Sequence, residues 1–100
     1  MSFEDAGAQL ESLNDADPDI AAALLMRVVR RAALEAAGRP VEPISVTIDV
    51  AGRLKAEAAL SFSAKIDRKT RTIVFAGGVA QYGEEIVMSA TAVYRIPPEA

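Results

Sequence analysis

Residues 54–66 read Leu-Lys-Ala-Glu-Ala-Ala-Leu-Ser-Phe-Ser-Ala-Lys-Ile, with an apolar residue at every second position. Successive side chains of a strand point to opposite faces of a sheet, so this alternation predicts a long strand with one buried face. Residues 44–50 and 84–96 alternate in the same way, and residues 70–81 form a further apolar stretch that a glycine pair interrupts. We therefore predict four strands within residues 44–96, with a bulge or bend at the glycine pair.

The connections between these strands are short. Residues 67–70 read Asp-Arg-Lys-Thr, which fits a type I turn, and Tyr82-Gly83 reverses the chain again. Such connections are too short for the crossover that parallel strands require. The strands after residue 50 should therefore be sequential antiparallel hairpins.

A long helix is expected before the strands. Asp17 is a suitable N-cap, Pro18 suits the first helical position, and Gly38 ends the pattern. Apolar residues lie almost all round this helix, which predicts a curved sheet that wraps it. A shorter helix is expected over residues 3–13. The chain is thus interpreted as one domain over residues 1–100, with an acidic helical segment at 1–16, a central helix at 17–38 and a four-stranded antiparallel sheet at 44–96.

Composition excludes several functions. The 100 residues include no His, Cys or Trp, which excludes Ser-His-Asp and Cys-His catalysis, disulfides, and zinc sites built on His or Cys. No metal and no cofactor is expected. The net charge is −3, and residues 1–19 contain acidic but no basic side chains, which argues against a nucleic-acid partner. The acidic start is unlike a signal peptide, and no apolar run has transmembrane length. We expect a cytoplasmic protein with no membrane partner.

A family resemblance begins at residues 51–58, Ala-Gly-Arg-Leu-Lys-Ala-Glu-Ala. This stretch looks like the G-x-L-x-A-x-A entry to the third strand of hotdog-fold acyl-CoA thioesterases of the phenylacetic-acid-pathway type. The basic turn at residues 68–71 and the closing stretch 86–96 fit as well. The resemblance implies an α+β hotdog fold, with a long central helix wrapped by a curved antiparallel sheet. It further implies a homodimer, or a tetramer, that takes acyl-CoA or another acyl thioester at the subunit interface.

The usual catalytic motif of that family is missing. The family commonly has His-Gly-Gly at the start of the helix and a catalytic Asp about two turns further on. This helix starts with Asp17-Pro18-Asp19, and its interior reads Leu-Met-Arg at residues 25–27. Glu35 is then the one candidate general base inside the helix, with Arg31 as its alternative partner in an ion pair. Asp19 is a second catalytic candidate at the helix start, where capping is the competing explanation.

Two further groups are candidate substrate-binding residues. By resemblance, Arg68, Lys69 and Arg71 lie at the turn that holds coenzyme A phosphates, although a solvated turn explains them equally well. Gly77 and Gly78 would permit close approach of the backbone to a ligand, with sheet curvature as the alternative. The outer faces of the long strands have small, uncharged centres, which suits a subunit interface.

Three functional interpretations remain open. The first is a thioesterase that hydrolyses an acyl thioester, and the second is a hotdog module that binds a ligand or assembles without catalysis. The third is a cystatin-like or nuclear-transport-factor-like cone that binds a small molecule. Strand order separates the fold classes, because a hotdog places residues 44–50 beside residues 84–96 and a simple meander places them beside residues 54–66.

Overall fold

The computed structural model describes residues 9–10, 17–54 and 59–98. Within these residues the chain forms one helix and five strands. In chain order they are β1 (Gln9–Leu10), α1 (Pro18–Ala37), β2 (Glu42–Val50), β3 (Leu60–Lys69), β4 (Ile73–Tyr82) and β5 (Glu85–Arg95).

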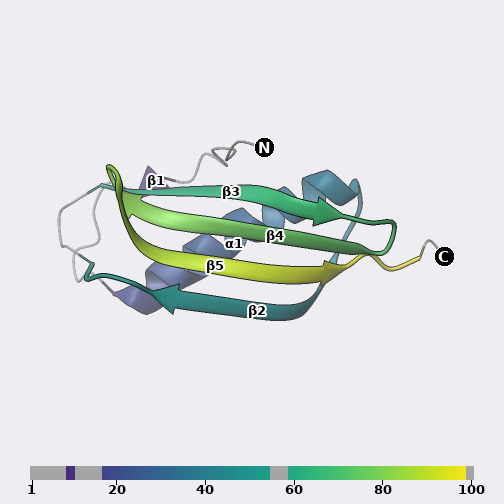
Figure 1. Ribbon diagram of the computed structural model, residues 1–100, viewed down its shortest axis with the longest axis horizontal. Helices are drawn as coiled ribbons and strands as arrows, with labels where there is room; N and C mark the ends of the chain where they lie inside the picture. Colours follow the sequence, from purple (N-terminus) through teal and green to yellow (C-terminus); the bar gives the residue numbers. More distant parts are fainter. Residues whose placement is uncertain (1–8, 11–16, 55–58, 99–100) are drawn as a thin grey trace.

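The strands form one antiparallel sheet in the order β1-β3-β4-β5-β2. β2 follows the helix in the chain, yet it lies at the sheet edge beside β5 and not beside β3 (Figure 1). This is the strand order that the hotdog interpretation requires. The simple meander and the cone interpretation are therefore wrong.

The helix has the predicted bounds because its ends are encoded locally. Asp17 is the N-cap, and its carboxylate accepts a hydrogen bond of 2.8 Å from the backbone N–H of Asp19. Gly38 adopts φ 74°, a left-handed conformation that glycine accepts without strain, and its N–H donates to the carbonyl of Leu34 at 2.9 Å.

One face of α1 is buried, not its whole circumference. The buried positions recur at helical spacing and pack against β3 and β4; they are Ala21, Leu25, Val28, Val29, Ala32 and Ala33. Ile20 and Leu34 remain more than a third exposed. The curved antiparallel sheet packs along this face of the helix (Figure 1), which is the predicted hotdog arrangement, although the helix is not buried on most sides as its sequence suggested.

β2 has an apolar face that the described residues leave largely exposed. Val46, Ile48 and Val50 pair with positions 92, 90 and 88 of β5, which lie on the helix side of the sheet and are buried. Directly paired residues share a face. Nevertheless, Val46 is 42% exposed and Val50 58% exposed.

β3 begins and ends later than the strand that the sequence predicts at residues 54–66. Leu54 lies outside a strand, residues 55–58 lie outside the described residues, and β3 continues through the predicted turn to Lys69. The register shifts between Ile66 and Arg68, which accommodates one extra residue. The reversal lies at residues 70–72, where the Oγ1 of Thr70 accepts from the N–H of Ile73 at 3.0 Å.

The glycine pair is not a bulge. Gly77 and Gly78 keep unbroken register with both neighbouring strands, and the shift in β4 lies between Ala80 and Gln81 instead. That shift changes which residues of β5 face the core. Ile86, predicted to point inward, is 48% exposed.

The N-terminal segment differs from the predicted helix where it is described. Gln9–Leu10 is a strand that pairs with Leu60 and Ser61 of β3, so a helix over residues 3–13 is wrong at these two positions. The other residues of that predicted helix lie outside the described residues.

Candidate functional site

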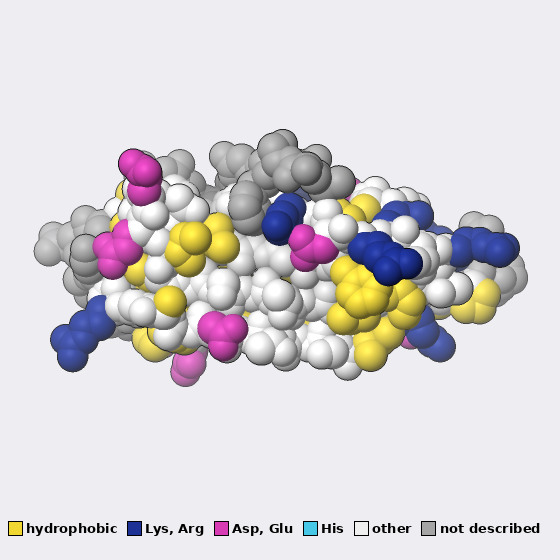
Figure 2. All heavy atoms as spheres, viewed as in Figure 1, with side chains coloured by type: hydrophobic (Ala, Val, Ile, Leu, Met, Phe, Trp, Pro, Cys, Tyr) yellow, Lys and Arg dark blue, Asp and Glu magenta, His cyan; other side chains and the backbone are white. Residues whose placement is uncertain are grey.

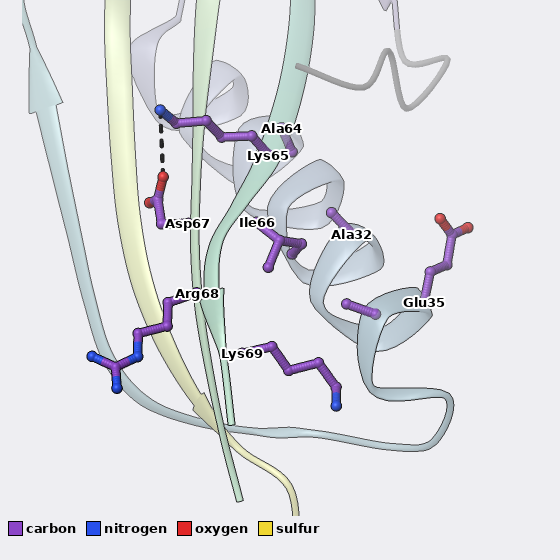
Figure 3. A pocket seen from close by; sticks show the side chains of 9 residues that line it. Ala32, Glu35, Ala64, Lys65, Ile66, Asp67, Arg68 and Lys69 are labelled. Atoms are coloured by element: carbon purple, nitrogen blue, oxygen red, sulfur yellow. Dashed lines mark ion pairs between the residues drawn. The ribbon is translucent and has the colours of Figure 1, made fainter. Parts of the chain in front are cut away.

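A hollow of about 470 Å³ lies between the second half of α1 and the edge of β3. Its apolar lining comes from Ala32 and Ala36 of the helix and from Ala64 and Ile66 of the strand. Small helix residues leave this space open, because an alanine side chain does not reach across to the strand. Glu35 and the basic residues of β3 lie around the hollow (Figure 3).

Glu35 lies at this hollow but points away from the strands, toward solvent (Figure 3). Its carboxylate lies 3.5 Å from the Nε of Arg31, and its side chain is 62% exposed. This is the predicted i,i+4 ion pair. The surroundings of Glu35 in the single chain are therefore those of a surface ion pair.

The three cations of the basic turn diverge. Arg68 and Lys69 are consecutive strand residues and therefore point to opposite sides of β3 (Figure 3). Lys69 lines the hollow beside the helix, while Arg68 also lines a hollow shared with β4 and β5. Arg71 lies past the strand end and lines a different hollow again. The three cations are therefore distributed over three hollows.

Arg71 instead shares a hollow of about 550 Å³ with Arg39. Thr70 and Thr72 also line it, so two guanidinium groups and two threonine side chains gather at one end of the sheet. Guanidinium groups and hydroxyls are groups that bind phosphate oxygens. Sequence analysis missed Arg39, because it follows the helix and meets the turn only once β2 and β5 have paired.

Asp19 lies at the other end of the helix from Glu35. Glu35 follows Asp19 by sixteen positions, which corresponds to a separation of about 24 Å along the helix axis. The two catalytic candidates are therefore alternatives and cannot act on the same atom within one protomer. Asp17 serves as the cap that the sequence predicted, while Asp19 is exposed in the first turn.

The two glycines allow different close approaches. A Cβ at Gly78 would lie 2.7 Å from both the carbonyl oxygen of Ser63 and the Cγ2 of Val29, so this glycine lets the helix pack on the sheet. A Cβ at Gly77 would lie 3.4 Å from an Asp67 carboxylate oxygen on the outer face. Neither glycine lines the hollow beside the helix or the hollow at Arg71.

Tyr94 is the one side chain of the described ranges that buries a polar atom without a hydrogen-bond partner. The residue is 1% exposed. Burial raises the pKa of its hydroxyl above the ordinary value of 10.0, and the nearby Arg30 guanidinium acts in the opposite direction. Its hydroxyl therefore stays neutral at physiological pH.

The described part of the chain lacks two features that often mark catalytic sites, buried charges and metal-binding clusters. Residues 17–54 and 59–98 contain no buried charged side chain. The described residues also contain no group of three or more acidic side chains that could hold a metal ion. Their single helix does not combine the length and the apolar character that a membrane crossing requires.

Comparison with solved structures identifies the architecture. A phenylacetic acid degradation-related protein from Ralstonia eutropha superposes with a TM-score of 0.73 at 16% identity, covering 88% of this chain and 73% of that one. The fold is the hotdog fold. The resemblance stated from the sequence is confirmed, since the structural neighbours are thioesterase-superfamily hotdog proteins.

Two further hotdog neighbours carry information about their own ligands and assembly. A Bacillus halodurans protein solved with CoA has a TM-score of 0.74 at 15% identity, covering 93% of this chain and 72% of that one. A hexameric thioesterase from Yersinia pestis has a TM-score of 0.71 at 8% identity, covering 92% of this chain and 86% of that one. Neither a protein-family model nor a curated protein sequence matches the chain.

Proposed function

We propose that this protein binds acyl-CoA thioesters between the two subunits of a homodimer. The uncovered apolar face of β2 carries this proposal. An edge strand with unpaired backbone groups and exposed Val46 and Val50 is suited to pairing with another strand. A second copy of β2, paired antiparallel about a two-fold axis, would join the two sheets and cover both apolar faces.

Such pairing would bring two complementary ends together. In an antiparallel pair, the start of one β2 lies beside the end of the other. The basic end at Arg39 and Arg71 of one subunit would then lie on the same side as the helix start of its partner. The N–H groups of a helix start can accept a thioester carbonyl oxygen, and the two arginines can hold coenzyme A phosphates.

Hydrolysis is the first candidate activity. A carboxylate would take a proton from water as the water oxygen attacks the thioester carbonyl carbon. The C–S bond would then break, and the resulting carboxylic acid would return the proton to the departing thiolate, releasing the thiol of CoA and a free acid. Asp19 and Glu35 are the candidate bases, and each would need the second subunit to exclude water from it.

Binding without hydrolysis is the second candidate, and one observation favours it. Both candidate carboxylates are exposed in the single chain, and Glu35 is already paired with Arg31. In the single chain neither carboxylate is enclosed in a site that could hold a water molecule against a thioester. The protein would then be a ligand-binding or assembly module.

The decisive experiment combines oligomeric state with acyl-CoA binding. Val46→Asp should convert a dimer to a monomer in light scattering and abolish acyl-CoA binding. Thr47→Asp places the same charge on the opposite face of β2, and we expect it to leave both properties unchanged. A wild-type monomer at micromolar concentration, or full acyl-CoA binding by the Val46→Asp monomer, would refute the interface site.

Thiol release from a panel of acyl-CoA esters separates the two activities. Turnover that falls at least a hundredfold in Asp19→Asn or Glu35→Gln would identify the base. Turnover that persists in both variants would exclude both carboxylates. Tight binding with no thiol release on any chain length would establish the non-catalytic module. Arg71→Gln should weaken acyl-CoA about tenfold without affecting acyl-pantetheine, which lacks the nucleotide phosphates.

A further inference from the structure

The sheet face turned away from the helix has its own hollow. It has a volume of about 400 Å³ and is lined from all four long strands, including Ser45 of β2, Arg68 of β3, Phe75 of β4 and Val93 of β5. Figure 2 views this outer face and shows hydrophobic side chains gathered toward one end with basic side chains beside them. The hollow is thus separated by the thickness of the sheet from the proposed thioester site.

The floor and wall of this hollow are apolar. Phe75 is 39% exposed, although the residues that follow it in β4, positions 76–80, are all buried. Val93 pairs directly with Phe75 and extends the apolar surface onto β5. Gly77 is the next residue of β4 on this face, and a Cβ there would lie 3.4 Å from an Asp67 carboxylate oxygen, so Asp67 borders the space beside the ring. An exposed aromatic ring next to an open space is a surface on which a planar group can stack.

One uncompensated cation lies beside this ring. The register shift at Asp67 places Arg68 directly opposite Phe75. Arg68 has no ion-pair partner among residues 17–54 and 59–98. Asp67 also lines the hollow, but its carboxylate lies 3.3 Å from the Nζ of Lys65, which offsets its charge. Ser45 and Thr91 add hydroxyl groups to the lining. A guanidinium group binds a carboxylate through two parallel hydrogen bonds, and hydroxyls can donate to the same oxygens.

We infer that this outer-face hollow binds a small planar aromatic carboxylate. The aromatic ring packs against Phe75 and Val93, and the carboxylate pairs with Arg68. The volume lies at the lower end of the range for ligand sites, which fits one or two fused rings. This site is independent of the proposed thioester site, because its residues lie on the opposite face of the sheet from α1.

Titration calorimetry with 2-naphthoate tests the inference, using the full-length protein. Wild type should bind 2-naphthoate, and Arg68→Gln and Phe75→Ala should each weaken binding at least tenfold. Both side chains are exposed, so neither change should unfold the protein. Lys69→Gln is the matched control, since it removes a cation one position along the same strand on the other side. Binding in Lys69→Gln should equal that of wild type.

Two related probes test the chemistry of the ligand. Decahydro-2-naphthoate lacks the planar ring and neutral 2-naphthamide lacks the charge, and each should bind at least tenfold more weakly than 2-naphthoate. No binding of 2-naphthoate at millimolar concentration would overturn the inference. Equal losses in Lys69→Gln and Arg68→Gln would also overturn it, because they would indicate nonspecific charge attraction.

Light scattering on the same variants tests whether a second copy occupies the hollow instead. If Phe75→Ala dissociates a larger oligomer while wild type binds no 2-naphthoate, the outer face is a subunit contact and the inference is wrong. The result for 2-naphthoate is separate from acyl-CoA binding. Loss of one in Arg68→Gln and of the other in Val46→Asp would show two independent sites.

Discussion

β3 and β2 have the same alternating sequence pattern but opposite surroundings. In β3 the apolar positions Leu60, Phe62 and Ala64 are buried beneath the helix. In β2 the equivalent face, on the same side of the sheet, holds Val46 and Val50 in contact with solvent. Alternation therefore shows that a strand has an apolar face, but it does not show whether the same chain covers that face or leaves it for another molecule.

The largest difference in stability between variants of β3 and β2 is expected when a buried side chain of β3 and an exposed side chain of β2 are truncated. Phe62→Ala should lower the free energy of unfolding by about 3–5 kcal/mol, because it opens a cavity under the helix. Val46→Ala should lower it by less than about 1 kcal/mol at protein concentrations that favour monomer. Urea unfolding monitored by circular dichroism measures both values.

Equal losses in the two variants would contradict this comparison, since they would mean that the single chain covers β2. A loss in Val46→Ala that grows with protein concentration would support coverage by a second copy.

A clash between helix and sheet should have the next largest effect. Gly78→Ala should lower stability by about 1–3 kcal/mol, because the added Cβ meets the carbonyl of Ser63 and the side chain of Val29 at 2.7 Å. Gly77→Ala is the matched control, and its Cβ meets only contacts of 3.3 Å or more. Thermal unfolding should show a clearly lower midpoint for the first variant. The same shift in both variants would exclude helix contact as the reason for Gly78.

Local sequence signals predicted the helix and the strand types well. The two ends of the helix are set by Asp17, Pro18 and Gly38. Each of these residues acts on its neighbours in the chain, so its effect does not depend on distant partners. The alternation of apolar residues likewise reports strand faces without knowledge of the partner strand. The order that places β2 beside β5 agrees with the resemblance stated from the sequence.

Features that depend on long-range register escaped prediction. Two of the three register shifts in the sheet turned Ile86 outward and placed Arg68 opposite Phe75, because each adds one residue to a strand. Arg39 and Arg71 line the same hollow because β2 pairs with β5, β5 with β4, and β4 with β3. Adjacent cations in the sequence looked like one binding cluster, but strand geometry points Arg68 and Lys69 apart.

Tyr94 lies on β5, between the covered and uncovered halves of the sheet, and its removal should be slightly favourable. Tyr94→Phe should raise the free energy of unfolding at pH 7 by up to about 1 kcal/mol, because the lost hydroxyl has no hydrogen-bond partner in the described part of the chain. The raised pKa of Tyr94 means that the unfolded chain releases this proton first as the pH increases. Wild-type stability should therefore fall above about pH 10, and Tyr94→Phe should reduce that fall. An unchanged alkaline profile would exclude Tyr94 as its source.

The smallest effect is expected at the ion pair that links β2 to β5. The Nη2 of Arg95 lies 2.8 Å from the Oε1 of Glu42, but both side chains are more than half exposed. Water and salt screen such pairs, so a double-mutant cycle with Arg95→Gln and Glu42→Gln should give a coupling energy below about 1 kcal/mol that decreases with added salt. β2 would then be held to the sheet mainly by its backbone ladder, which leaves the side-chain face free for a second copy. A salt-independent coupling above about 2 kcal/mol would contradict this, because it would require a desolvated pair at the end of the strand.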